Sequence, residues 1–346
     1  MIPEEKKKEF YSGYKVLSYG TSWIFVIGNR TAGKSFFWKE YAINRFLKYG
    51  EQFVYIRRYK NDLKKVVKNF FNDIGFKFQG HKMTVKGREF FVDGKLAGFA
   101  IALTEGEQNK SNSLPNVKLM IFDEFLNKKE RYIGGRDGKA EVEDCIDLYM
   151  TIARGGGEYV RDDVRFVFIS NAMSIINPYF LYFGIERRIK KGMKFLTQGN
   201  NKKGWVLELY VNEDAKNAVK ESKLGDLIEG TDYARMALDN EFFLDDSEFI
   251  EKAPKGCRFQ CTMKYAGRTF GLWEDHFNNV YYINEKYDPS CKIVYSLDIG
   301  DHTARTILAN RSSQFFRNLK KAYENGQIRF NSQLAKNALL IYLKLS

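Results

Sequence analysis

The chain has 346 residues, more than one hydrophobic core usually supports, so two domains are expected. Its 56 Lys and Arg residues outnumber its 43 Asp and Glu residues, and the net charge of +13 favours a polyanionic partner. No apolar run is long enough to span a bilayer, and the charged N-terminus lacks the hydrophobic region of a signal peptide. We therefore expect a soluble, cytoplasmic protein with no membrane partner.

The cysteines and histidines argue against a structural zinc site. The four cysteines are scattered, and the spacing Cys257-x-x-x-Cys261 has no second Cys or His pair at the distance that zinc sites use. The chain has only 3 histidines to complete such a site. We expect all four cysteines to be reduced residues that take part in packing.

The first predicted element is a phosphate-binding loop between a strand and a helix. A charged lead-in, residues 1–22, is expected to wrap over the surface, and the apolar run from Trp23 then breaks into the pattern G-x-x-x-x-G-K-S. Glycines let the backbone approach phosphate oxygens, and the following helix adds its partial positive N-terminal charge. In this pattern the lysine reaches the β- and γ-phosphates and the serine hydroxyl ligates Mg²⁺. The predicted nucleotide site consists of Gly28, Asn29, Arg30, Thr31, Ala32, Gly33, Lys34 and Ser35.

The next predicted strand ends in two arginines. A helix over Ser35–Leu47 is followed by a short strand, Phe53–Ile56, and then by Arg57 and Arg58. Ligands of an open parallel sheet bind at the carboxyl ends of its strands, so these arginines are candidates for sensing nucleotide or DNA. The alternative is that they begin a solvated helix, which the pattern of residues 61–71 predicts.

Small hairpins and a polar loop come next. The apolar runs between Met83 and Leu103 are separated by Lys86-Gly87 and Asp93-Gly94, which predicts antiparallel hairpins that decorate the sheet. A polar stretch then leads to Pro115.

A second motif carries paired carboxylates at the end of a buried strand. The apolar run Lys118–Phe122 ends in Asp123 and Glu124. In P-loop ATPases this is the Walker B arrangement, in which the first acid holds the Mg²⁺ shell and the second polarises the attacking water. Such a pair is common by itself and becomes specific when it follows a P-loop at this distance.

The elements that follow complete a doubly wound α/β core. Residues 141–153 fit an amphipathic helix that ends at Arg154 and three glycines. The strand Val164–Ile169 leads to Asn171, where ATPases of this class place a polar residue against the γ-phosphate. Alternating strands and helices of this kind predict a parallel sheet with one ATP site.

The rest of the chain contains a basic cluster and then a region in which short strands are predicted. The segment from Arg187 to Lys203 is basic with interleaved aromatic residues, and it is either a nucleic-acid contact or a solvated face. We predict an ATPase domain over residues 1–211, a helical linker over 212–245 and a small α+β domain over 246–346. In that last domain we expect short strands at 257–265, 269–273, 280–283 and 292–299 and helices at about 303–323 and 331–344.

The segments GNRTAGKS, FVYIRRYKNDLKK, IFDEF and FISNAMSIINPYF, followed by FGLWEDHFNNVYYI, resemble the DNA-packaging (encapsidation) ATPases of phi-29-like small tailed bacteriophages. The resemblance covers nearly the whole chain and implies an ASCE-type ATPase domain. It also implies a homo-oligomeric ring, usually of five subunits, that uses ATP to translocate double-stranded DNA through the portal into an empty procapsid. Such a protein acts in the host cytoplasm, attaches transiently to the portal vertex and is not expected in the mature virion. Some relatives dock through a structural RNA, so a packaging RNA is a candidate partner.

The resemblance also implies individual roles. It assigns phosphate and Mg²⁺ binding to Lys34 and Ser35, and it makes Asp123 a ligand of the metal shell. Glu124 is implied as the catalytic base and Asn171 as a sensor. The implied cations that act on the ATP of a neighbouring subunit are Arg154 and Lys110.

The tail resembles the RNase H-like nuclease domain of large terminases, with one departure. The strand Arg258–Met263 has no acid where a nuclease needs its first metal ligand. Asp298 and Asp301 are the only candidate pair of metal-binding acids. Because two-metal cleavage needs convergent carboxylates, we expect a vestigial nuclease that grips DNA, RNA or the portal. From Arg305 onward eight basic residues face a single acid, Glu324, which supports this role.

Other function classes remain open from the sequence. One is a terminase-like ATPase with an active metal-dependent nuclease, and another is a helicase. A non-catalytic nucleotide-binding assembly factor is a third, against which the intact Lys34, Asp123 and Glu124 argue.

Overall fold

The computed structural model divides into two compact units, Met1–Leu244 and Asp245–Ser346. It describes residues 10–105, 114–127, 132–134, 139–154, 161–172, 175–186, 188–189, 193–198, 204–231, 248–265 and 267–343. In these ranges no helix is both long and apolar enough to cross a membrane.

The N-terminal unit contains a large, mostly parallel sheet. Its strands are β1 (Trp23–Gly28), β2 (Gln52–Arg57), β3 (Met83–Lys86), β4 (Glu89–Val92), β5 (Lys95–Ala102), β6 (Val117–Asp123), β7 (Arg165–Ser170), β8 (Phe195–Thr197) and β9 (Trp205–Tyr210). They lie in the order β3-β4-β5-β2-β6-β7-β1-β9-β8. Strands β5, β2, β6, β7, β1 and β9 are parallel, whereas β3, β4 and β5 form the predicted antiparallel hairpins. Strand β8, which the sequence did not predict, pairs antiparallel with β9.

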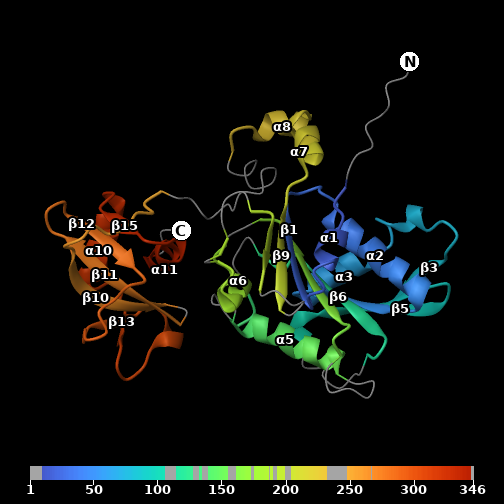
Figure 1. The fold of residues 1–346 in the computed structure, drawn as a ribbon, viewed down its shortest axis with the longest axis horizontal. Coiled ribbons are helices and arrows are strands. Elements are labelled where there is room, and N and C mark those ends of the chain that lie inside the picture. The colour runs from blue at the N-terminus through green and yellow to red at the C-terminus, as the bar shows by residue number, and fades with distance from the viewer. Residues whose placement is uncertain are drawn as a thin grey trace. The chain divides into compact units, whose positions relative to one another are not determined.

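Helices cover both faces of this sheet, which confirms the doubly wound α/β architecture (Figure 1). They are α1 (Tyr14–Leu17), α2 (Lys34–Tyr49), α3 (Lys60–Lys68), α5 (Lys139–Ala153) and α6 (Pro178–Phe183). Side chains of α2 and α3, including Trp38 and Leu63, pack on one face, and side chains of α5 and α6, including Leu148 and Tyr179, pack on the other. The central strands are buried on both faces, which explains their continuous apolar runs.

Strand order brings the predicted motifs to one edge of the sheet. Strand β7 lies between β1, which leads into the P-loop, and β6, which ends at Asp123. In this register Asp123 is opposite Ile169 of β7, and Ile27 of β1 is opposite Ser170. The carboxyl ends of these three strands therefore place the P-loop, the acid pair and Asn171 side by side.

Two short helices follow the sheet. Helix α7 (Glu213–Lys220) begins at Asn212, whose side chain accepts a hydrogen bond from the Ala215 N–H. Helix α8 (Lys223–Ile228) begins in the same way at Ser222. These helices agree with the helical pattern of the predicted linker, whose residues 232–245 lie outside the described residues.

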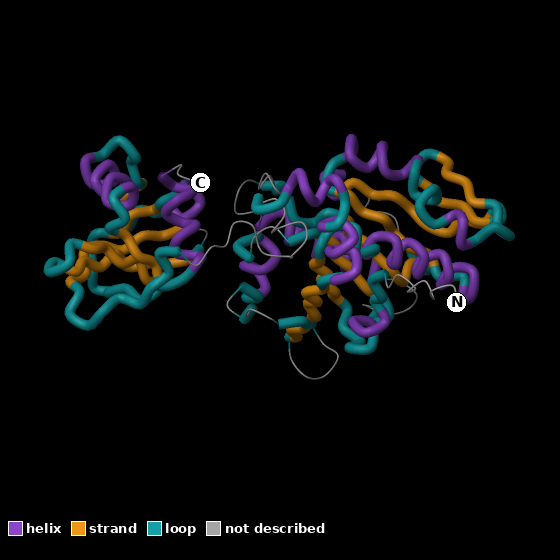
Figure 2. Tube along the Cα trace, turned by 90° about the horizontal axis from the view of Figure 1, so that it is seen from above, coloured by secondary structure: helices purple, strands orange, loops and turns teal. Residues whose placement is uncertain are grey.

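The C-terminal unit has a sheet of its own (Figure 2). Its strands are β10 (Arg258–Tyr265), β11 (Arg268–Asp275), β12 (Val280–Asn284), β13 (Val294–Ser296), β14 (Ile307–Leu308) and β15 (Ile328–Phe330). An antiparallel meander of β10, β11 and β12 is extended by parallel pairing of β13 to β10, β14 to β13 and β15 to β12. Helices α10 (Gln314–Glu324) and α11 (Gln333–Leu343) complete the unit.

The sequence predicted this unit incompletely. The expected helix over 303–323 is wrong at its start, because the chain forms β14 first and the helix begins only where the Ser313 hydroxyl accepts from the Phe316 N–H. Strand β15 was not predicted, since a run of three residues is too short to show a period. The antiparallel strands of the meander are confirmed.

Candidate active site

The P-loop has the backbone geometry that its glycines predict. Gly33, directly before α2, has φ of 89°, which is a left-handed conformation that favours glycine. A Cβ atom on Gly28 would lie 2.7 Å from the Tyr210 carbonyl oxygen, so β9 leaves no room for a side chain there. Thr31 also has a positive φ, of 62°. The loop is thus bent tightly between β1 and α2, as a phosphate cradle requires.

Lys34 is buried at the centre of the site. Its ammonium donates to the carbonyl oxygens of Gly28 at 2.8 Å and Asn29 at 2.7 Å, and to Asn171 Oδ1 at 3.3 Å. Burial lowers the pKa of Lys34 to about 7, against the opposing effect of the Asp123 carboxylate. The predicted sensor Asn171 therefore contacts the predicted phosphate-binding lysine.

Asp123 and Ser35 form the candidate metal site. The Ser35 hydroxyl donates to Asp123 Oδ1 at 3.1 Å, and the Tyr55 hydroxyl donates to Asp123 Oδ2 at 2.6 Å. Carboxylate and hydroxyl oxygens are the hard ligands that Mg²⁺ prefers, so the residues fit this ion. Tyr55 fixes the orientation of the carboxylate from β2. No local pattern predicted this role for Tyr55, because a tyrosine within an apolar strand is typical of ordinary core packing.

Glu124 extends from a strained turn at the end of β6. Its φ is 61°, and its N–H donates to the Ile169 carbonyl oxygen at 2.8 Å, which holds the turn against β7. Its side chain is 71% exposed and pairs with Arg57 Nη2 at 3.1 Å. Arg57 Nη1 also donates to the Asp123 carbonyl oxygen at 3.1 Å. Arg57 thus contacts the acid pair itself, and the alternative of a solvated helix start is wrong for this arginine.

Arg58 is buried in a network behind the acid pair. Its guanidinium forms a bidentate pair with the fully buried Glu141, with both N···O distances at 2.8 Å. It also donates to the carbonyl oxygens of Glu124, at 3.4 Å, and Phe125. The Tyr179 hydroxyl donates to Glu141 at 2.7 Å. This network connects the acid-pair turn to the first turn of α5, a role that neither sequence alternative for Arg58 included.

The N-terminal segment lies against the P-loop. Tyr11 is buried, its N–H donates to the Ala32 carbonyl oxygen at 2.9 Å, and its hydroxyl donates to Glu208 at 2.8 Å. Burial raises the pKa of Glu208 to about 7. The lead-in is therefore anchored to the nucleotide loop through Tyr11, more firmly than the expected surface wrapping.

A side chain of the P-loop reaches the helices that follow the sheet. Asn29 is fully buried, and its Nδ2 donates to the Asn212 carbonyl oxygen at 3.2 Å while its Oδ1 accepts from the Asn212 N–H at 3.0 Å. The sequence predicted only a backbone role for Asn29. Its side chain joins the nucleotide loop to the residue that caps α7.

Arg154 lies at the opposite edge of the sheet from this site. Helix α5 runs back along the sheet and ends beside the start of β7, where the Tyr149 hydroxyl donates to the Val164 carbonyl oxygen at 3.1 Å and the Arg161 N–H donates to Ala153 at 2.6 Å. A six-residue strand such as β7 spans about 20 Å. Arg154 is exposed and is separated from its own P-loop by this length.

Comparisons with known proteins agree with this geometry. The family model described as podovirus DNA encapsidation protein (Gp16) matches residues 5–345. The chain belongs to this family. It is 40% identical over 335 residues to the DNA packaging protein of Bacillus phage phi29, with 96% of each chain covered. Its function in phage DNA packaging therefore rests on a relationship that spans almost its whole length.

Solved structures show the same relationship. A chain in the bacteriophage phi-29 genome packaging motor assembly matches with a TM-score of 0.73 and 38% identity, covering 97% of this chain and 98% of that one. The N-terminal domain of the phi29 DNA packaging ATPase matches with a TM-score of 0.52 and 42% identity, covering 59% of this chain and 98% of that one.

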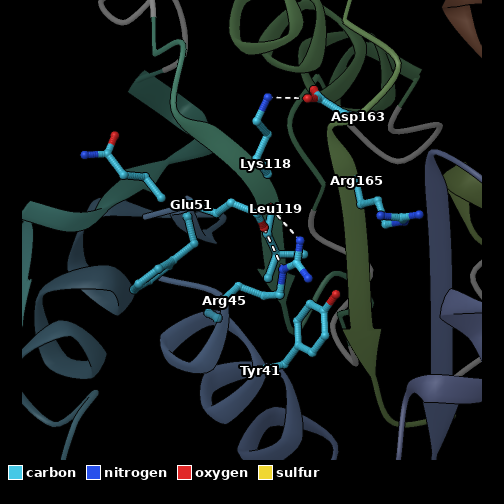
Figure 3. A pocket seen from close by; sticks show the side chains of 10 residues that line it. Tyr41, Arg45, Glu51, Lys118, Leu119, Asp163 and Arg165 are labelled. Atoms are coloured by element: carbon cyan, nitrogen blue, oxygen red, sulfur yellow. Dashed lines mark hydrogen bonds and ion pairs between the residues drawn. The ribbon is translucent and has the colours of Figure 1, made fainter. Parts of the chain in front are cut away.

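A separate hollow of about 120 Å³ lies at the amino ends of β2, β6 and β7, away from the P-loop. Four of its charged lining residues form two pairs, since Arg45 binds Glu51 at 2.5 Å and Lys118 binds Asp163 (Figure 3). The residues that line it include none of the predicted site residues.

In the C-terminal unit the two acids of the candidate nuclease pair accept hydrogen bonds from backbone N–H groups. Asp298 accepts from the Gly300 N–H at 2.5 Å, and Asp301 accepts from the Gly267 N–H at 3.0 and 3.1 Å. Over the part of the chain that the structure describes, no three His, Cys, Asp or Glu side chains gather as the two-metal site of a nuclease would require.

Two predicted groups lie wholly or mostly outside the described residues. Lys110 belongs to residues 106–113, which are among those not described. Of the basic cluster, Arg188 and Lys194 are described, and Arg188 donates to the Thr197 carbonyl oxygen at 2.6 Å and lies over Trp205. The roles assigned to these groups stay predictions.

Proposed function

We propose that this family member is the ATP-hydrolysing motor subunit that translocates double-stranded DNA into a preformed procapsid. The observation that carries the proposal is the convergence of five predicted residues at one edge of the sheet. Contacts join Lys34 to Asn171 and Ser35 to Asp123, and Glu124 follows directly. This is the set of groups that phosphoryl transfer to water requires.

Each residue has a distinct task in the proposed reaction. The P-loop N–H groups and Lys34 would bind the ATP phosphates, with Asn171 beside them. Ser35 and Asp123 would hold Mg²⁺, which when bound neutralises charge on the phosphate oxygens. Glu124, exposed next to this position, would orient the attacking water and accept its proton. To do so, its carboxylate has to turn from Arg57, because the pair with Arg57 occupies one of its oxygens.

The position of Arg154 supports a homo-oligomeric ring. Arg154 cannot reach its own phosphates from the far edge of the sheet, whereas an exposed cation there can contact the ATP of a neighbouring subunit. Such an arginine contributes about 10³–10⁵ in rate in other NTPases. We propose a ring of five subunits at the portal vertex, formed in the host cytoplasm and absent from the mature virion. Lys110 is proposed as a second cation acting across the interface, and a packaging RNA as a docking partner.

Substitution Glu124→Gln tests the site directly. The amide keeps the shape of the side chain and cannot accept a proton, so ATP binding should persist while steady-state hydrolysis falls by at least about 100-fold. Glu143→Gln, the same change on an exposed position of α5, is the control and should hydrolyse normally. Hydrolysis by Glu124→Gln within a few-fold of wild type would remove Glu124 from the role of base.

Mixing two inactive variants tests whether neighbouring subunits share an active site. Arg154→Ala subunits and Lys34→Ala subunits should each hydrolyse poorly alone, because each lacks one half of every interface site. Their mixture should regain activity, since an intact P-loop then meets an intact arginine. A mixture that assembles and stays inactive would contradict action of Arg154 on a neighbour.

The C-terminal unit is proposed to grip nucleic acid or the portal without cutting. The local hydrogen bonds of Asp298 and Asp301 support this over an active nuclease. Metal-dependent nicking of plasmid DNA by the full chain, lost in Asp298→Asn or Asp301→Asn, would overturn it.

A further inference from the structure

Arg161 is a buried cation outside the ATP site, and its partners are backbone carbonyls. Its side chain is 7% exposed. Nη1 donates to the Pro115 carbonyl oxygen at 2.5 Å, and Nη2 donates to Leu114 at 3.3 Å and to Ile152 at 2.5 Å. Its backbone N–H donates to the Ala153 carbonyl oxygen at 2.6 Å. Its nearest acid, Asp163, is 3.9 Å away and mostly exposed, so carbonyl binding is the main role of the guanidinium.

These contacts fix the end of α5. The last carbonyl groups of a helix have no partner within the helix, and a cation there also meets the negative end of the helix dipole. The carbonyl groups of Ile152 and Ala153 are two of these. The Arg161 side chain binds the first, and the Arg161 backbone N–H binds the second. Arg154 is the next residue along the chain.

Arg161 also lies close in sequence to the proposed interface cation Arg154. Three glycines, residues 155–157, follow Arg154 directly. A backbone hydrogen bond from Arg161 to Ala153 joins the residues on either side of this stretch. The guanidinium of Arg161 also binds Leu114, the residue that follows the segment carrying Lys110. The Arg161 side chain therefore binds Ile152, near Arg154, and Leu114, which follows the segment that carries Lys110.

We propose that Arg161 is a positioning residue for hydrolysis on the neighbouring subunit: it holds the last turn of α5 against the Leu114–Pro115 stretch, so that Arg154 is presented across the subunit interface. The inference rests on the proposed action of Arg154 on a neighbour's ATP. It assigns Arg161 no contact with nucleotide.

The test uses full-length Arg161→Gln and Arg161→Lys in assembled motors. Arg161→Gln removes the charged guanidinium, whose Nη1 and Nη2 bind the carbonyl oxygens. It should lower steady-state ATP hydrolysis by about tenfold or more, up to the loss seen for Arg154→Ala. Arg161→Lys keeps the charge without the planar guanidinium, and its rate of hydrolysis should fall between those of Arg161→Gln and wild type. The Kd of a fluorescent ATP analogue should stay within about twofold of wild type in both, because each variant's own P-loop is at the other edge of the sheet.

Two further measurements separate positioning from general destabilisation. Mixing Arg161→Gln with Lys34→Ala subunits should restore hydrolysis, because the intact P-loop of the first then faces a correctly held Arg154 of the second. The double variant Arg154→Ala/Arg161→Gln should be no slower than Arg154→Ala alone, since both changes remove the same contribution. The matched control is Lys118→Ala, which removes the ion pair to Asp163 (Figure 3) without touching α5, and it should hydrolyse normally.

The outcomes distinguish this inference from the function on which it rests. If Arg154→Ala is complemented by Lys34→Ala while Arg161→Gln hydrolyses like wild type, only the role of Arg161 is overturned. A slow Arg161→Gln that mixing does not restore, or that binds the ATP analogue weakly, would make Arg161 merely structural and also overturn it. If Arg154→Ala itself hydrolyses like wild type, the proposed interface role of Arg154 fails.

Discussion

At the scale of single residues, burial and charge have opposite effects on the pKa of Lys34. Its low pKa means that the nucleotide-free protein holds much of this side chain neutral above about pH 7. Phosphate oxygens favour the charged form, so ATP binding should raise the pKa again. We therefore expect ATP binding to be coupled to proton uptake.

The corresponding prediction is that ATP binding at pH 8 takes up a fraction of a proton and that affinity weakens as the pH rises above 7, by at most about tenfold per pH unit. Calorimetry in buffers of different ionisation enthalpy measures the uptake. Lys34→Arg is the control, because a guanidinium keeps its proton throughout this range, so any binding that it retains should take up none. Wild-type binding without proton uptake would show that Lys34 is already charged.

Tyr55 provides a second prediction at this scale. Tyr55→Phe keeps the buried ring and removes the hydroxyl that orients Asp123. Loss of such an outer contact typically lowers metal affinity by about 10–100-fold, so the Mg²⁺ concentration for half-maximal hydrolysis should rise by about that factor. Tyr149→Phe removes a hydroxyl at the other edge of the sheet, which donates to the Val164 carbonyl oxygen, and it should leave the Mg²⁺ requirement unchanged. An unaltered Mg²⁺ requirement in Tyr55→Phe would show that the Tyr55 hydroxyl has no part in metal binding.

At the scale of elements, Asn29 joins the P-loop to the start of α7. Asn29→Ala would leave the buried N–H and carbonyl of Asn212 without these partners, which should lower the free energy of unfolding by about 2 kcal/mol. Asn212→Ala removes only the helix cap and should cost about 1 kcal/mol. Urea denaturation of both variants measures the difference. Equal stability of Asn29→Ala and wild type would mean that the bonded pair contributes nothing.

Elements with a strong local signal could be predicted from the sequence, and those set by tertiary contacts could not. The P-loop, the Asp123–Glu124 strand end and the helix before Arg154 carry glycine patterns, apolar runs or a 3.6-residue period. By contrast, Tyr55 reads as an ordinary strand residue, and only strand order places it beside Asp123. The contacts of Arg161 join positions 46 and 47 residues apart, a separation that no local pattern encodes.

At the scale of the whole molecule, the net positive charge should appear in how the protein binds DNA. Helix α10 exposes Arg317 and Lys321 four residues apart on one face. If the C-terminal unit contacts phosphates, Arg317→Gln/Lys321→Gln should weaken binding of double-stranded DNA of any sequence and reduce the slope of log K against log salt by about 2.

The matched control places the same charge change on the N-terminal unit. Lys64→Gln/Lys68→Gln removes two exposed lysines with the same spacing on α3 and should alter DNA binding less. Filter-binding titrations at several salt concentrations provide the comparison. An equal loss in both double variants would mean that DNA is bound through general charge and not through α10.

The central claim is that ATP hydrolysis at the carboxyl edge of the large sheet moves DNA into the procapsid. Its most direct test is the amount of nuclease-protected DNA in procapsids supplied with wild-type or Glu124→Gln protein and ATP, with binding of both proteins to procapsids confirmed. We expect wild type to protect genome-length DNA and Glu124→Gln to bind ATP and protect none. Packaging by Glu124→Gln at a rate near that of wild type would contradict the claim.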